Sequence, residues 1–317
     1  MEKEKPAHIG GQAVIEGVMM RGRSMYALAV RGSDGTVTVE EAALKSRSPS
    51  IAKIPIIRGL FAFADSMALG FKIITRSAEL AGLEDENTEP GKIEKFLTEK
   101  LGERLNDILI FISVLFAIAL SIGLFIMLPV FMGGLLAGAT FLAGHSWAFG
   151  IIEGILRLII FVCYIYIISL SKDIRRVYEY HGAEHKTINC LEHGEELTVD
   201  NVARHSRYHK RCGTSFLLFV MVISMLFFLF VRTDDPVIRI ASRLLFVPLI
   251  AGVSYEVLRW AGRSKSKFVE VVSYPGIKLQ GMTTKEPDKG QIECAILATE
   301  AVVAKEFSAA EGAAGNA

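Results

Sequence analysis

Long apolar runs in the middle of this chain constrain its fold more than any other feature. A helix needs about 20 mostly apolar residues to cross the hydrocarbon core of a bilayer. Four runs in the chain approach this length. The fourth is the weakest, because two Arg residues and a Pro interrupt it. The sequence therefore predicts a mainly α-helical integral membrane protein with about four transmembrane helices. The four runs are Asp107–Leu128, Phe149–Ser171, Thr214–Val231 and Val237–Ser254.

Polar and apolar residues are segregated along the chain. Hydrophobic residues make up 51% of the 317 residues and charged residues 22%, a balance that fits neither a wholly soluble domain nor a bare transporter body. We expect small α+β cytoplasmic segments at both ends. The three expected parts are an N-terminal cytoplasmic α+β module with an amphipathic helix (1–100), a four-helix transmembrane region with a cytoplasmic His-rich insertion at 172–213 (101–260), and a C-terminal cytoplasmic segment (261–317).

Local patterns predict elements in both polar ends. Met25–Arg31 and Thr36–Glu40 have the composition of two strands joined by a hairpin turn. From Ile54 to Gly82 the apolar residues recur at helical spacing, and the charges among them predict a helix that lies on the bilayer instead of crossing it. Phe268–Met282 has the pattern of strands around a Pro-Gly turn, and Gly290–Phe307 predicts an Ala-rich helix.

Positive charge sets the expected orientation of the chain. The loop 172–213 holds eight Lys and Arg residues, whereas 131–153 holds none. Both termini and the loop should therefore face the cytoplasm, in a multi-pass protein of the cytoplasmic (inner) membrane. The mixed-charge opening of the chain indicates no signal peptide. Because the basic residues border the apolar runs, we expect contacts with the lipid bilayer and none with nucleic acid.

The loop between the second and third runs concentrates residues that can bind a metal. Five of the seven histidines lie between Asp173 and Gly213. We expect the second span to continue into this loop as a helix, which places His181 and His185 on one face, one turn apart. With Glu184 they form the pattern His, two residues, Glu, His, found in inverzincin metallopeptidases, where the His pair binds zinc and the Glu activates water. Glu184 is therefore the candidate general base.

A second group of candidate ligands follows along the chain. Thr198 has the character of a helix cap, and the helix that it starts should deliver His205 and His209, with Cys212 three residues further on. Zinc accepts both His nitrogen and Cys thiolate, and a catalytic site needs about three protein ligands. The preferred ligand set is His181, His185 and His209, with Cys212 as a fourth ligand or a supporting group. These donors favour zinc over magnesium, while iron, cobalt and nickel stay open.

Structural roles compete with these chemical ones. Neutral histidines also cap helices and bond to backbone carbonyls, and we interpret His193 and His205 as ordinary surface residues. Glu16 is a lone carboxylate in an apolar stretch, most simply bonded to nearby backbone. Glu153 and Arg157 lie four apart in the second run, so we expect an ion pair, although such a pair can also mark a transport path.

Four longer segments resemble the YqhQ-type family of bacterial membrane proteins, which is of unknown function and is often described as predicted metal-dependent enzymes. The segments are GGQAVIEGVMMRG, YHGAEHKTIN, HKRCGTSFL and TTKEPD. The resemblance covers nearly the whole chain. It implies a multi-spanning cytoplasmic-membrane protein with a His-based metal site, which falls here on His181, Glu184, His185, His209 and Cys212.

Two classes of function fit these observations. In the first, a membrane-embedded metal-dependent hydrolase acts on a lipid-linked or peptide bond at the cytoplasmic interface, with zinc as the expected divalent cation. In the second, a non-enzymatic carrier or scaffold uses the cluster as a structural metal site. An open coordination position discriminates the two, because four protein ligands close a structural site. A homo-oligomer is compatible with either class, and the sequence does not specify the substrate.

Overall fold

The computed structural model describes residues 9–44, 54–82, 104–138, 146–231, 233, 235–261, 264 and 266–314. The chain divides into two compact units. The first unit combines three separate stretches of sequence, and the second unit combines two. The stretches of the first are Met1–Glu84, Ile165–Val220 and Ala251–Ala317, and those of the second are Asp85–Tyr164 and Met221–Ile250.

A four-stranded antiparallel sheet forms the base of the first unit. Its strands follow one another as successive hairpins, in the order β1-β2-β3-β4. The predicted hairpin is confirmed as β3 and β4, while a further hairpin within the Gly-rich opening segment was not predicted. That hairpin turns through Ile15 and Glu16, with Glu16 at a positive φ of 51°. The strands are β1 (Gly10–Val14), β2 (Gly17–Arg21), β3 (Met25–Arg31) and β4 (Val37–Ala43).

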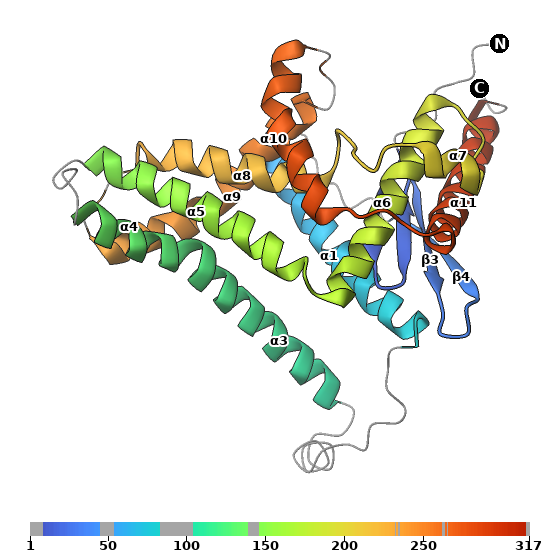
Figure 1. The fold of residues 1–317 in the computed structure, drawn as a ribbon, viewed down its shortest axis with the longest axis horizontal. Helices are drawn as coiled ribbons and strands as arrows, with labels where there is room; N and C mark the ends of the chain where they lie inside the picture. The colour runs from blue at the N-terminus through green and yellow to red at the C-terminus, as the bar shows by residue number, and fades with distance from the viewer. Residues whose placement is uncertain are drawn as a thin grey trace. The chain divides into compact units, whose positions relative to one another are not determined.

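Helices cover both faces of this sheet because its side chains alternate between two cores. Val18, Met20 and other residues of one face pack against α6 (Lys172–His193) and α11 (Lys289–Ala314), which lie beside the strands in Figure 1. Met19, Leu28 and other residues of the opposite face pack against Ile73 of α1. Helix α1 (Ile57–Leu80) confirms the helix predicted for Ile54 to Gly82.

The predicted Ala-rich helix is confirmed as α11 and begins with a reciprocal cap. The Asp288 carboxylate accepts from the Gln291 backbone N–H at 2.8 Å, and the Gln291 side-chain oxygen accepts from the Asp288 N–H at 2.9 Å. Two N–H groups that have no partner within the helix are satisfied in this way. The Glu-Pro-Asp sequence before the helix therefore fixes where it starts.

The strands predicted for Phe268–Met282 are wrong. This segment is a helix, α10 (Lys267–Thr283), with Pro275 inside it. Its C-terminal part is held by buried Gln280, whose side chain donates to the His209 carbonyl at 2.8 Å and accepts from the His209 N–H at 2.9 Å. Such long-range bonds can override the β preference of a Val-rich stretch.

The helix predicted to run unbroken from the second span into the loop is also interrupted. Helix α5 (Ser146–Ile168) ends before Ser171, whose backbone is extended, and α6 starts anew at Lys172. Glycine then ends α6, since Gly194 adopts the left-handed conformation at φ 73°. The predicted cap is confirmed: the Thr198 hydroxyl accepts from the Asn201 N–H and starts α7 (Val199–Arg204).

Among the described residues, three helical stretches are long and apolar enough to cross a membrane, instead of the four expected. The run predicted as Thr214–Val231 forms α8 (Gly213–Phe228), whose 16 residues fall short of the length that spanning requires. The run that Arg residues interrupt is long enough, within α9 (Pro236–Ala261). The three stretches are Ile108–Leu136, Phe149–Ile168 and Val237–Ala261.

The first of these stretches contains a π-helical turn before Pro129. Helix α3 (Arg104–Ile122) passes through η2 (Gly123–Met127) into α4 (Leu128–Gly138). Proline lacks an N–H and its ring crowds the carbonyl four residues earlier, which here belongs to Phe125. That carbonyl accepts from Arg157 Nε at 3.0 Å, so an arginine satisfies the group that the proline leaves without its helical donor.

A buried ionic network holds the helices of the second unit. The predicted Glu153–Arg157 pair is confirmed at 2.6 Å, and Arg243 joins it with two further bonds to the Glu153 carboxylate, at 2.8 and 3.1 Å. Arg157 also donates to the Ser224 hydroxyl at 3.3 Å. We refer to Glu153, Arg157, Arg243 and Ser224 as the arginine network. The bonds to the Glu153 carboxylate explain how α9 carries Arg243 inside an apolar stretch.

Candidate metal site

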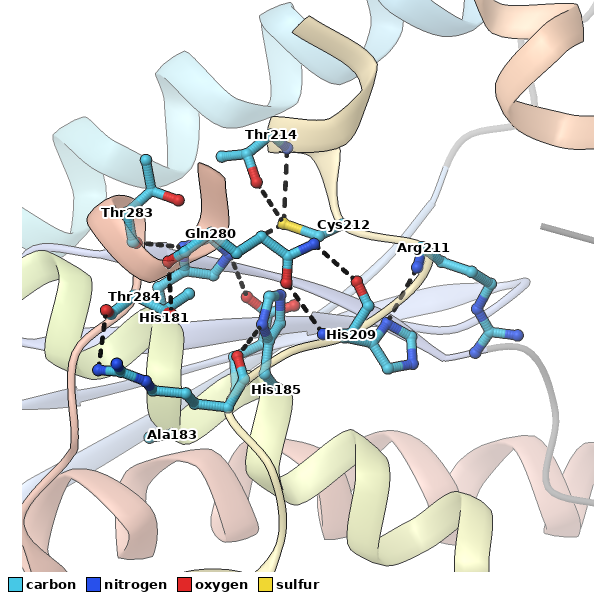
Figure 2. A network of polar contacts seen from close by, with 12 residues as sticks. His181, Ala183, His185, His209, Arg211, Cys212, Thr214, Gln280, Thr283 and Thr284 are labelled. Carbon is cyan, nitrogen blue, oxygen red and sulfur yellow. Dashed lines mark hydrogen bonds and ion pairs between the residues drawn. The ribbon is translucent and has the colours of Figure 1, made fainter. Parts of the chain in front are cut away.

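Helix α6 and the segment before α8 bring three potential ligands together. His181 and His185 lie one turn apart with ring centroids 4.4 Å apart, and Cys212 lies next to them (Figure 2). The ligand atoms of these three residues all lie within 4.8 Å of one another. His185 and Cys212 are buried, and His181 is partly so. The structure thus gathers three of the four predicted ligands into one group.

Backbone carbonyls orient both imidazole rings of this group. His181 Nδ1 lies 2.8 Å from the Thr283 carbonyl oxygen, and His185 Nδ1 lies 2.6 Å from the Arg207 carbonyl oxygen. Because a carbonyl only accepts, each Nδ1 donates to its carbonyl, and the tautomer of the neutral ring that does so has its lone pair on Nε2. A partner on one ring nitrogen is what fixes a metal-binding histidine and raises its basicity. Both Nε2 atoms are therefore prepared to coordinate a cation.

The thiol of Cys212 completes this arrangement. Its Sγ lies 3.4 Å from His181 Nε2, 3.1 Å from the Thr214 hydroxyl and 3.5 Å from the Thr214 backbone N–H. An N–H directed at sulfur complements the negative charge of a metal-bound thiolate. Two imidazole nitrogens and one sulfur are a donor set that suits zinc, so the residues fit the cation predicted from the sequence.

The fourth predicted ligand, His209, lies beside the trio with both ring nitrogens engaged. Its Nε2 is 3.3 Å from the Glu192 carboxylate, and its Nδ1 accepts from the Arg211 N–H at 3.4 Å. Its ring centroid is 5.8 Å from that of His185. The sequence preferred His209 over Cys212 as the third ligand, whereas this geometry favours Cys212. The ligand roles themselves stay predictions.

Glu184, the candidate base, is buried close to the histidines. One carboxylate oxygen lies 4.0 Å from His181 Nε2, and the backbone of Gly11 passes close to the Glu184 side chain. Burial raises the pKa of the Glu184 carboxyl above its usual value, against the opposing attraction of His181 and His209. Burial also lowers the pKa of His185 and favours the neutral ring. A raised carboxyl pKa and a neutral imidazole suit a general base beside a metal ligand.

Two glycines allow backbone to approach this group. A Cβ on Gly182 would lie 2.0 Å from the Lys285 carbonyl oxygen, and a Cβ on Gly11 would lie 2.7 Å from Glu184 Cγ. The Lys285 N–H in turn donates to the Tyr178 carbonyl at 2.8 Å. The glycine of the His-Gly-Ala-Glu-His sequence therefore lets the segment after α10 pass over α6, where Thr283 reaches His181.

A cavity of about 390 Å³ adjoins the trio. Strand β1 forms one side of it, and α6 and the segment around Cys212 form others. Glu184 lines the same cavity as the three potential ligands, so a molecule in the cavity would meet Glu184 and the His/Cys group together. The residues contributed by β1 are Gly10, Gly11, Gln12 and Ala13.

Other residues singled out in the sequence have different surroundings. His205 belongs to a second group, with Cys190 and Glu195, whose ligand atoms lie within 4.8 Å of one another. The His193 ring lies next to the His205 ring, with the two ring centroids 5.1 Å apart. Glu16 pairs with the Arg176 guanidinium at 2.6 Å instead of with nearby backbone.

Sequence reasoning missed the groups that orient the ligands. The Thr283 and Arg207 carbonyls leave no trace in side-chain spacing, and Gln280 lay within a segment predicted to form strands. The TTKEPD segment carries the family resemblance and precedes the predicted Ala-rich helix, and neither observation predicts that Thr283 and the backbone crossing Gly182 lie at the site. The participation of β1 in the cavity depends on the pairing of distant segments, which no local pattern reveals.

The fold and the site together define a class: a mainly helical protein whose described residues include three candidate membrane-spanning helices, and in which a His/Cys group lies beside a small antiparallel sheet. The chain belongs to the family described as "Protein of unknown function (DUF1385)", which matches residues 54–305. It is 37% identical over 300 residues to "Uncharacterized protein YqhQ" of Bacillus subtilis (strain 168), covering 93% of this chain and 92% of that protein. No solved structure matches the chain.

Proposed function

We propose that this protein is a membrane-bound metal-dependent hydrolase, with His181, His185 and Cys212 as metal ligands and Glu184 as general base. The observation that carries the proposal is the convergence of two Nε2 atoms and one thiol beside a cavity that also contains a buried carboxylate. Zinc is the cation that the donor set favours. We place the site on the cytoplasmic side of the inner membrane, with both termini on that side, from the distribution of Lys and Arg.

The chain's own residues divide the chemical work. A bound zinc ion would supply a Lewis acid that polarises a carbonyl and acidifies water. Glu184 accepts the proton of the attacking water and passes it to the leaving group, a role that contributes about 10²–10⁴-fold in rate. Gly11, which has no side chain, leaves room for the Glu184 side chain beside β1, and the Thr283 and Arg207 carbonyls hold the two imidazoles.

The alternative is a carrier or scaffold in which the same group is a structural metal site. A structural zinc site is closed by four protein ligands. His209, the remaining ligand of the predicted set, would be the fourth ligand, but its Nε2 faces the Glu192 carboxylate. Three donors next to a cavity support a site with an open position, and therefore the enzyme.

The test compares two variants in the purified full-length protein. Glu184→Gln should keep its metal content and lose zinc-dependent hydrolysis of fluorogenic peptide and acyl-ester substrates, because only the proton acceptor is removed. His185→Ala should lose both metal and hydrolysis, while His193→Ala, on the exposed end of α6, should keep both. Equal loss of metal in Glu184→Gln and His185→Ala would make Glu184 a ligand and overturn its role as the base.

A further inference from the structure

The cavity beside the metal site has an unusual wall, an edge strand. Strand β1 stands at the edge of the four-stranded sheet, and four of its five residues line the cavity. An edge strand presents N–H and C=O groups that have no strand partner on one side. Which residues present them can be worked out from the pairing of β1 with β2.

The register of the hairpin fixes the direction of each backbone group. Val14 pairs with Gly17 across a two-residue turn, and in such a turn the flanking pair exchanges hydrogen bonds with each other. Alternation then directs the N–H and C=O of Gly11 and Ala13 away from β2. One contact agrees with this direction: the Ile15 N–H, which points the same way, donates to the Ser77 hydroxyl at 3.2 Å.

Three backbone groups therefore line the cavity side by side: the Gly11 carbonyl, the Ala13 N–H and the Ala13 carbonyl. Gly10 and Gly11 are exposed, and Ala13 is half-buried. The small side chains of this strand leave the edge accessible. A Cβ at Gly11 would collide with Glu184, so the smallest residue lies where the strand passes the base.

We propose that β1 binds the substrate as an extended polypeptide, which adds a strand to the sheet and places a peptide carbonyl beside His181, His185 and Cys212. The inference rests on the proposed hydrolase function and specifies its substrate class. Water adds to the carbonyl carbon, the C–N bond breaks, and the proton taken up by Glu184 leaves with the amine. The products are one carboxylic acid and one amine.

The backbone of a polypeptide matches this wall better than an acyl chain does. Extended peptides carry donors and acceptors in alternation, as does the free edge of β1, and main-chain bonds of this kind supply affinity in strand addition. An acyl chain carries neither donors nor acceptors. An acyl chain bound along β1 would therefore leave the Ala13 N–H and the Ala13 carbonyl without a hydrogen-bond partner on the substrate.

Proline at an outward-facing position tests the edge without removing a bond within the sheet. Ala13→Pro removes the outward N–H of β1. The matched control is Val39→Pro on β4, the opposite edge. Bonds from Leu44 N–H to Ser24 and from Gly32 N–H to Thr36 place the alternate residues of β4 in the ladder, so the N–H of Val39 also points outward.

The measurement is the binding of three hydroxamates to the zinc-loaded full-length protein in detergent, by calorimetry. The probes are a tripeptide hydroxamate, an octanoyl hydroxamate and acetohydroxamate, which share the metal-binding group. The tripeptide probe should bind tightest, and Ala13→Pro should weaken it roughly tenfold, the value of about one hydrogen bond. Acetohydroxamate binding and zinc content should not change, and Val39→Pro should behave as the unmodified protein.

The outcomes separate the two proposals. Equal behaviour of Ala13→Pro and Val39→Pro, or tightest binding of the octanoyl probe, would overturn the peptide edge while leaving the hydrolase in place. Failure of the unmodified protein to bind zinc or acetohydroxamate would overturn the proposed function and this inference with it.

Discussion

The candidate metal site and the arginine network are both buried polar clusters, yet they differ in where their polar atoms point. In the arginine network both oxygens of Glu153 accept from guanidinium groups, and Arg157 also reaches Ser224 and the Phe125 carbonyl. In the candidate metal site, carbonyls engage Nδ1 of His181 and of His185, and the Nε2 atoms lie on the side of the Cys212 thiol. Burial of polar groups alone therefore does not single out a candidate functional site; potential metal ligands that converge beside a cavity do.

The largest expected effect breaks the arginine network. Glu153→Ala leaves two buried guanidinium groups without their counter-charge, so we expect a loss of about 3–5 kcal/mol in the free energy of unfolding. Denaturation in detergent micelles measures it. Arg175→Ala, which removes an exposed pair with Glu179 at 3.5 Å, should cost at most about 1 kcal/mol. Similar losses in both variants would contradict the structural role of the network.

A somewhat smaller effect is expected where backbone crosses α6. Gly182→Ala places a methyl group 2.0 Å from the Lys285 carbonyl oxygen, and we expect about 1–3 kcal/mol of destabilisation from the forced shift. The shift should also displace the Thr283 carbonyl from His181 and weaken metal binding. Gly10→Ala serves as the control, because a Cβ there meets nothing within 4 Å. Unchanged metal affinity in Gly182→Ala would contradict a role in metal binding for the segment that crosses α6.

The support of Cys212 gives a finer test of the metal site. Thr214→Val removes the hydroxyl that lies 3.1 Å from the sulfur and keeps the side-chain shape. Loss of such a supporting contact typically weakens metal affinity about 10–100-fold, and we expect the lower end of that range. Thr214→Ser retains a hydroxyl and should bind metal as the unmodified protein does. Competition with a chromophoric chelator measures both affinities.

The pH dependence of the metal-free protein should show the smallest effect. The pKa of Glu184 is raised in the folded state above its usual 4.5, so the fold favours the protonated carboxyl. This contribution is fully present below pH 4.5 and is lost as the pH rises through the folded-state pKa. The metal-free Glu184→Gln protein should therefore be the more stable one above that window, with no such advantage below it. Thermal unfolding over a pH series would contradict this if the advantage grew toward low pH.

Local patterns in the sequence account for the parts of the molecule that local physics decides. The spacing of His181 and His185 on a helix, the cap at Thr198 and the pair of Glu153 with Arg157 each depend on residues within one or two turns. The hairpin of β3 and β4 follows for the same reason, from two strand-like runs and one turn.

Contacts between distant segments decide what the sequence left open or predicted wrongly. The sequence predicts strands in place of α10 because His209, which bonds to Gln280 of this helix, lies in another segment. His209 was preferred as a ligand because its attraction to Glu192 is invisible in spacing. Arg243 interrupts an apolar run in the sequence, and its partner Glu153 cannot be recognised there because it lies on a different helix. The same holds for β1, whose edge became part of the cavity only through the folding of the sheet against α6.

Elemental analysis of bound metal tests the central claim most directly. The protein would be purified in detergent without a His tag, next to the His181→Ala/His185→Ala double variant and the His193→Ala control. We predict near-stoichiometric zinc, or a similar divalent metal, in the unmodified protein and in the control, and its loss in the double variant. Metal absent from all three samples after reconstitution, or retained by the double variant, would contradict the proposed site.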